Sequence, residues 1–147
     1  MLAVGLAVWL LSSLAWSRGS ARLLAWRDLT PELGRVEFPR KSLRVFHDRA
    51  ALEEYLRAVM PGRGPQAPRL DFSRREALLI AAGPRSSTGY ELEILRVTER
   101  RKDIRVLARE TTPSLGQRVV PRLTSPYRLI TIPVTAKRVY VSWQGRP

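Results

Sequence analysis

Alternation of apolar and polar residues dominates the second half of the chain. Four segments alternate with the period of two that marks a half-buried β-strand, namely residues 89–97, 103–110, 127–134 and 139–143. The short run 43–46 adds a further strand signal. The pattern therefore predicts a fold built mainly from strands.

Residues 77–82 differ from these segments because they form a continuous apolar run, ALLIAA. The capping box formed by Ser73 and Glu76 favours a helix here. The run is too short for a stable helix, however, and better fits a central strand covered on both faces. Pro133 lacks a backbone donor, which limits the strand over residues 127–134 to a sheet edge or a strand end.

One amphipathic helix is predicted over residues 49–60. Asp48 stands at the N-cap position, and the Pro61-Gly62 pair ends the helix. The apolar residues recur at i, i+3, i+4 and i+7 and form a single stripe that docks on the sheet; they are Leu52, Tyr55, Leu56 and Val59.

The order of these elements indicates the fold class. Neighbouring strands are joined by short turns, such as the one at residues 100–103, which favours antiparallel hairpins. The sequence therefore predicts an α+β domain over residues 41–147, with a curved antiparallel sheet or partial barrel of about six strands and one packed helix.

The N-terminal region reads as a targeting segment. Residues 1–16 are apolar and carry no charge, so we expect residues 1–21 to be a signal peptide or membrane anchor. Arginines follow the apolar run instead of preceding it, which leaves open an anchor with the domain in the cytoplasm, a start codon further upstream, or a buried helix. We expect residues 22–40 to be a tether containing one short helical turn at Thr30-Pro31-Glu32, and the domain to be extracytoplasmic, either secreted or anchored to the cell membrane.

The charge balance is strongly basic. Lys and Arg number 26 against 13 acidic residues, which gives a net charge of +13. A genome rich in G and C produces such an arginine bias without any functional cause. An anionic partner such as nucleic acid, lipid headgroups or cell-wall polymer is the functional interpretation. The arginines are scattered along the chain, which is typical of solvated faces.

The sequence contains no recognisable catalytic constellation. His47 is the only histidine and cysteine is absent, so we expect neither a metal site nor a cofactor. Glu91 and Glu93 share one strand face, where cross-strand ion pairs are the usual outcome. Ser86 and Ser87 supply hydroxyls, but no base that could activate them is recognisable. We therefore expect a protein that is not an enzyme.

The segment from Gly83 to Tyr90 combines small polar side chains with a glycine that can adopt positive φ. It carries one part of a resemblance to the PrcB-like family of protease complex subunits, whose elbow reads Gly-x-x-x-Thr-Gly-Gly-Tyr. Ser87 stands where the family usually has Thr, and Thr88 stands where it has the first Gly. The other matching pieces follow in the family's order; they are residues 46–55, 71–73 and 124–127.

This resemblance implies an exported module that associates non-covalently with a secreted protease and has no activity of its own. The sequence is also weakly similar to Ig-like cysteine-protease inhibitors, whose Asn-Pro-Thr-Thr-Gly-Tyr loop enters a protease cleft. Residues 86–90 are the analogue, but the Asn-Pro pair is missing.

Together these observations predict an accessory domain that binds a protein partner, for example a secreted or membrane peptidase. The alternatives are an arginine-rich module binding anionic envelope polymer, lipid or nucleic acid, a hydrolase using Ser86 or Ser87, and a turn that merely shapes a hairpin. The turn Arg85–Tyr90 and the loop after residue 113 form the predicted contact surface; its residues are Arg85, Ser86, Ser87, Thr88, Gly89, Tyr90, Gly116, Pro126 and Tyr127.

Overall fold

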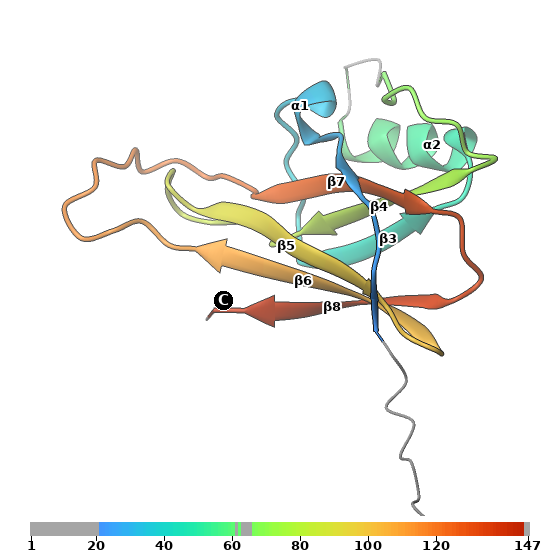
Figure 1. Cartoon of the computed structure of the whole chain (residues 1–147). Helices are drawn as coiled ribbons and strands as arrows, with labels where there is room; N and C mark the ends of the chain where they lie inside the picture. Colours follow the sequence, from blue (N-terminus) through green and yellow to red (C-terminus); the bar gives the residue numbers. More distant parts are fainter. Residues whose placement is uncertain (1–20, 61, 63–65, 146–147) are drawn as a thin grey trace, which may run out of the picture.

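Two four-stranded β-sheets pack face to face in the computed structural model, and a helix covers the outer face of one of them (Figure 1). The structure describes residues 21–60, 62 and 66–145. The strands are β1 (Arg22–Leu23), β2 (Arg27–Asp28), β3 (Ser42–Phe46), β4 (Arg75–Ala81), β5 (Glu91–Glu99), β6 (Asp103–Thr111), β7 (Tyr127–Pro133) and β8 (Arg138–Gln144), and the helices are α1 (Thr30–Leu33) and α2 (Arg49–Val59).

The strand order is β1-β5-β6-β8 in one sheet and β2-β7-β4-β3 in the other. We call the first sheet A and the second sheet B. The prediction of a single curved sheet or partial barrel is wrong, because β4 and β7 are apolar on both faces and need cover on both sides. Helix α2 covers one face of sheet B and sheet A covers the other. The prediction of an antiparallel sheet also needs one correction, since β6 and β8 run parallel.

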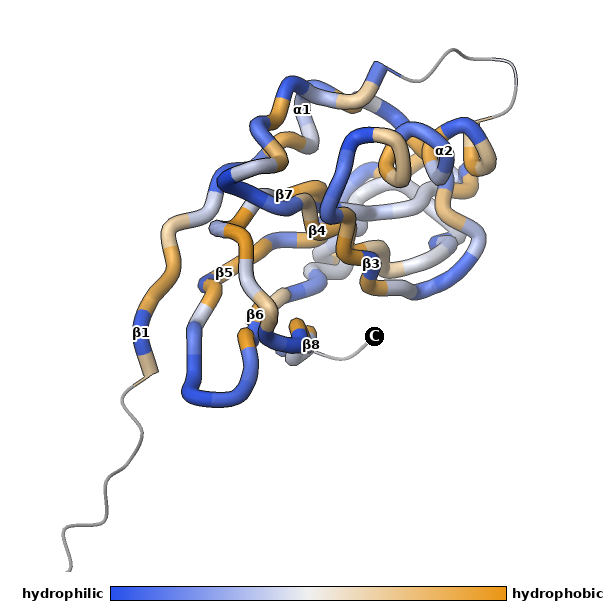
Figure 2. Tube along the Cα trace, turned by 90° about the vertical axis from the view of Figure 1, so that its right-hand side faces the viewer, coloured by the Kyte–Doolittle hydropathy of each residue, from blue (hydrophilic) through white to orange (hydrophobic). Residues whose placement is uncertain are grey.

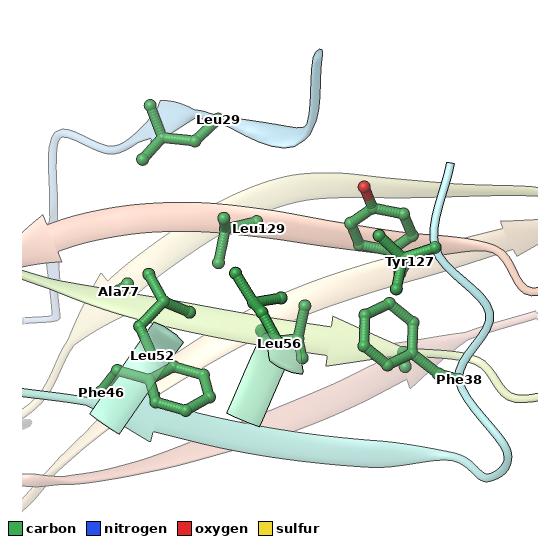
Figure 3. Close-up of a cluster of buried hydrophobic side chains, with 11 residues drawn as sticks. Leu29, Phe38, Phe46, Leu52, Leu56, Ala77, Tyr127 and Leu129 are labelled. Atoms are coloured by element: carbon green, nitrogen blue, oxygen red, sulfur yellow. The ribbon is translucent and has the colours of Figure 1, made fainter. Parts of the chain in front are cut away.

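Strand β4 belongs to two hydrophobic cores at once. Leu78 and Ile80 face the core between the sheets, whereas Ala77 and Leu79 face the core beneath α2. All four are fully buried. Figure 3 shows the core beneath the helix, where Leu52 and Leu56 of α2 meet residues of the sheet and of the segment before it. The predicted central strand is confirmed.

Helix α2 begins and ends close to the predicted positions. The carboxylate of Asp48 accepts a hydrogen bond from the backbone N–H of Ala51 at 2.8 Å, which confirms the N-cap. The turn between β5 and β6 is also confirmed by the hydrogen bond from Arg100 N to Asp103 O at 2.8 Å, and it is strongly hydrophilic (Figure 2). Strand β7 ends at Pro133, as that residue's missing donor requires.

Residues 22–40 are part of the fold, which corrects the expectation of a tether. Strand β1 extends sheet A, β2 extends sheet B, and the predicted helical turn is present as α1. Leu29, Val36 and Phe38 are buried in the core beneath α2. The spacings between them, seven and two residues, fit no single helical or strand period, so the sequence pattern did not predict their burial.

The predicted signal peptide or anchor, residues 1–21, lies outside the described residues except for Ala21. Among the residues that the structure does describe, none of the helices has the length and apolar character needed to cross a bilayer.

Candidate partner-binding surface

Two connections between strands lie side by side at one end of the molecule. The first joins β4 to β5, and we call its residues 84–90 the elbow. The second joins β6 to β7, and we call its residues 112–126 the loop. Figure 1 shows the loop projecting beyond the ends of the strands, with the elbow beside its base. Arg85 and Thr124 join them as an antiparallel bridge, with N–O distances of 2.8 and 2.9 Å.

Hydrogen bonds from the elbow's polar groups hold the loop in place. The backbone N–H of Thr88 donates to Val120 O at 3.0 Å, and the Thr88 hydroxyl accepts from Val120 N at 2.9 Å. The Thr124 hydroxyl donates to Ser87 O at 2.8 Å. Ser86 is exposed. The sequence predicted the polar groups of Ser87 and Thr88 as partner contacts, but in the structure they form hydrogen bonds with the loop.

Gly89 is required by both its backbone conformation and its close neighbours. Its φ is +93°, which confirms the predicted positive φ. A Cβ at this position would lie 3.0 Å from Val119 Cγ1 and 3.1 Å from Pro113 Cγ. Gly116, in the loop itself, has φ +83° with no atom within 4 Å of the corresponding Cβ position. The loop therefore packs directly against the elbow at Gly89 and is open at Gly116.

Arg85 is held by a buried ion pair with Glu110 at the end of β6. Its Nε and Nη2 donate to the two carboxylate oxygens at 2.5 and 2.7 Å. The side chains are only 19% and 4% exposed. The hydrogen bond to Glu110 raises the pKa of Arg85, although burial opposes it. Most of the Arg85 guanidinium is therefore committed to Glu110 and only a small part remains for an outside ligand.

Glu110 was not singled out from the sequence, although a signal for it exists. In the alternating segment 103–110 the inward positions are Ile104, Val106, Ala108 and Glu110. A carboxylate on an apolar strand face needs a cationic partner because burying an unpaired charge is costly. The inward position of Glu110 in this alternation therefore indicated a buried ion pair.

Tyr90 and Pro126 line a cavity of about 210 Å³ between residues 35–37 and the loop, together with Arg35, Glu37 and Arg122. On the other side of residues 123–125 lies a groove of about 480 Å³, whose wall includes Phe38, Val59 and Pro84. The structure thus brings Tyr90 and Pro126 together, as expected for one surface.

Tyr127 instead belongs to the core. Its ring packs edge-on against Phe38 with a centroid distance of 5.0 Å, and its hydroxyl donates to Gly34 O. Burial raises the pKa of Tyr127 to about 12, and Asp28 adds to the effect. Only 8% of the residue is exposed, so its ring supports the fold and is not available to a partner.

The loop displays the largest concentration of exposed apolar side chains among the described residues. Leu115 is fully exposed, and Val120 and Leu123 are 58% and 61% exposed. Arg118 and Arg122 alternate with them and are exposed too. The sequence predicted the loop as part of the contact surface only from Gly116 and the prolines near it. The apolar residues of the loop follow no strand or helix period, so their exposure was not predicted.

His47 and Glu76 form a second pair of ionisable side chains, at the end of β4 opposite to the elbow. His47 Nδ1 lies 3.0 Å from Glu76 Oε2. Glu76 is 1% exposed, and burial raises its pKa while the nearby His47 lowers it. Within the described ranges, no group of three or more His, Cys, Asp or Glu residues is arranged to hold a metal ion.

The fold and this surface define a class of small β-domain, in which a paired elbow and loop stand at the end of two packed sheets. Residues 77–133, from β4 through the elbow and the loop to β7, match the family described as PrcB C-terminal. The family resemblance predicted from the sequence is thereby confirmed over this segment. No curated protein and no solved structure matches the chain.

Proposed function

We propose that the chain is a non-enzymatic, extracytoplasmic accessory domain that binds a protein partner, a secreted or membrane peptidase, through the loop and the neighbouring part of the elbow. The match to the PrcB C-terminal family supports an accessory role. The observation that carries the proposal is the exposure of Leu115, Val120 and Leu123 on a loop that is bonded to the elbow.

Exposed apolar side chains grouped on one loop indicate a contact surface, because a monomer gains nothing from leaving them in water. Here Arg118 and Arg122 flank them and supply the polar surroundings that interfaces have. The cavity beside Tyr90 and the groove beside Pro84 flank the base of the loop. They provide hollows for side chains of a partner.

Pre-organisation of the loop supports the same role. Five hydrogen bonds join it to Arg85, Ser87 and Thr88 of the elbow. A loop already fixed in its bound shape loses less conformational entropy on association, which favours affinity. The elbow therefore acts mainly as the support of the contact surface, and we expect direct contact with the partner only from Pro84, Ser86 and Tyr90.

The test is a pull-down from the membranes and secreted fraction of the cells that make the protein, with the full chain as bait. The bait is compared with a Leu115→Ser/Val120→Ser/Leu123→Ser variant and with a matched control, Leu23→Ser, in which a 71% exposed leucine of β1 is changed. The parent and Leu23→Ser should recover a peptidase that the loop variant loses. Recovery of the same peptidase by the loop variant would place the contact elsewhere, and recovery of no peptidase by any bait would overturn the function.

The basic charge favours one second candidate, a surface that binds an anionic polymer, lipid or nucleic acid. The net charge of +13 would draw such a ligand to exposed arginines such as Arg118 and Arg122. Binding of a polyanion falls steeply with added salt because counterions are released. Contact through apolar side chains is far less sensitive, so a salt titration of the recovered complex separates the two candidates.

A further inference from the structure

We propose that the free edge of β8 accepts an extended, acidic segment of another protein as an added strand of sheet A. Strand β8 is the last strand of the order β1-β5-β6-β8. It pairs with β6 in regular parallel register from Asp103↔Arg138 to Arg109↔Gln144. Figure 2 shows β8 on the same side of the molecule as β3, the edge strand of sheet B, and away from β1.

An edge strand presents a row of unpaired N–H and C=O groups that can pair with a further strand. Proteins usually block such edges with prolines, charges, bulges or very short strands. Strand β8 has no proline, and from Val139 to Gln144 it has no charged residue. The other edges of the described sheets are shorter, with two residues in each of β1 and β2 and five in β3, against seven in β8.

The surface beside this edge is hollowed. A groove of about 520 Å³ lies between β3 and the start of β8, lined by Val45, His47 and residues 135–140. Side chains of an extended segment alternate between the two faces of the sheet. The side chains on the inner face of an added strand would enter the groove between Val45 and Val139, and the others would pass Tyr140.

Charge selects an acidic occupant. Lys41 and Arg138 are exposed on the β3 and β8 side. Arg44 instead stacks on the Tyr55 ring of α2, 4.5 Å from its centre, on the other face of sheet B. Within the described residues neither Lys41 nor Arg138 has a carboxylate at ion-pair distance, and Asp103, opposite Arg138 on β6, is already held by Arg105 at 3.2 Å. Lys41 Nζ lies 4.0 Å from the centre of the Trp143 ring, which places a cation beside the C-terminal end of β8. A second copy of this basic chain would bring like charges together, so a separate, acidic segment fits better.

Recognition of this kind takes its affinity from main-chain hydrogen bonds and its specificity from alternate side chains. It uses the backbone of β8 and no residue of the elbow or the loop. The proposal is therefore independent of the proposed function. Failure of the β8 test would not contradict partner binding through the loop, because the two tests use different variants.

The probe is a seven-residue peptide of alternating glutamate and valine with blocked ends, matched to the seven residues of β8. Binding to the full chain is measured by fluorescence anisotropy, and the amides of β8 are followed by hydrogen exchange. The peptide should bind saturably and protect alternate β8 amides. A lysine–valine peptide should bind at least about tenfold more weakly, which corresponds to 1.4 kcal/mol.

Two further comparisons separate strand pairing from simple charge attraction. Methylating every second peptide nitrogen, in both alternating patterns, should abolish protection in one pattern because it removes the donors that face β8. Arg138→Glu should weaken binding at least about fivefold, whereas the control Arg118→Glu on the loop should leave it unchanged.

The proposal is overturned if both methylated peptides bind as tightly as the parent peptide, or if β8 amides exchange equally fast with and without the probe. It is also overturned if the chain alone forms a dimer whose β8 amides are protected more strongly as its concentration rises. In that case a second copy occupies the edge.

Discussion

The elbow (residues 84–90) and the loop (residues 112–126) lie side by side, but their polar and apolar groups point in opposite directions. The elbow is polar in composition, and Arg85 and Thr88 turn their polar groups toward Glu110 and Val120. The loop carries Leu115, Val120 and Leu123, and these point outward into solvent. A segment's composition therefore says little about its role until the partners of its hydrogen bonds are known.

The difference follows from where each segment starts and ends. The elbow leaves the central strand β4, all of which beyond Arg75 is buried, so its first polar groups lie next to the core and must be satisfied there. The loop leaves the exposed end of β6 and extends beyond the sheets, where no second layer covers it (Figure 1). The elbow is thus bound to the scaffold and the loop is displayed by it.

The largest expected effect comes from removing the cation of the elbow. Arg85→Ala leaves the Glu110 carboxylate, 4% exposed, without its partner, so the free energy of unfolding should fall by about 3–5 kcal/mol. Arg109→Ala breaks the pair with Glu93, in which both side chains are about half exposed, and should cost no more than about 1 kcal/mol. Urea denaturation of both variants makes the comparison. If both variants lost the same free energy of unfolding, the Arg85–Glu110 pair would stabilise the fold no more than a surface ion pair does.

A smaller loss is expected where the loop touches the elbow. Gly89→Ala forces a side chain into a residue at φ +93° and against Val119 and Pro113, so the free energy of unfolding should fall by about 2–3 kcal/mol. Gly116→Ala has a similar φ of +83° and free space around it, so it should lose only the backbone part, about 1 kcal/mol. Thermal or urea denaturation distinguishes them. If the two variants lose the same amount, the packing between loop and elbow contributes nothing.

Local patterns in the sequence predicted individual elements well. Each expected strand is present, and α2 begins directly after Asp48 because the Asp48 carboxylate caps the first turn. The pairing of strands was harder, because alternation specifies which face of a strand is buried but not which strand lies beside it. The parallel β6–β8 pair and the division into two sheets depend on long-range packing that no local period records.

The candidate surface was predictable in part for the same reason. Gly89 could be recognised, since a positive φ is a local property. The burial of Glu110 could have been recognised from its inward position in the alternating strand. The outward position of Leu115 could not, because an apolar residue in an irregular segment is buried or exposed according to what the rest of the fold places around it.

A loss of about 1 kcal/mol is expected from the hydroxyl that holds the loop. Thr88→Val keeps the shape of the side chain but removes the acceptor of the Val120 N–H. Hydrogen exchange at Val120 should accelerate about fivefold, since 1 kcal/mol corresponds to that factor. Thr112→Val, at the exposed start of the loop, is the control and should leave this amide unchanged. Unchanged exchange in Thr88→Val would show that the hydroxyl does not hold the loop.

The smallest effect on stability is expected at the tip of the loop. This prediction distinguishes a residue exposed for partner contact from a residue that stabilises the fold. Leu115 is fully exposed, so Leu115→Ser should change the free energy of unfolding by less than about 0.5 kcal/mol. Leu129→Ala, in the core beneath α2, should cost about 2–5 kcal/mol in the same urea titration. Binding of the recovered peptidase should respond in the opposite way, falling strongly in Leu115→Ser while folded Leu129→Ala retains it. A loss of stability in Leu115→Ser comparable to that in Leu129→Ala would mean that the loop is packed against the fold and is not a displayed contact surface.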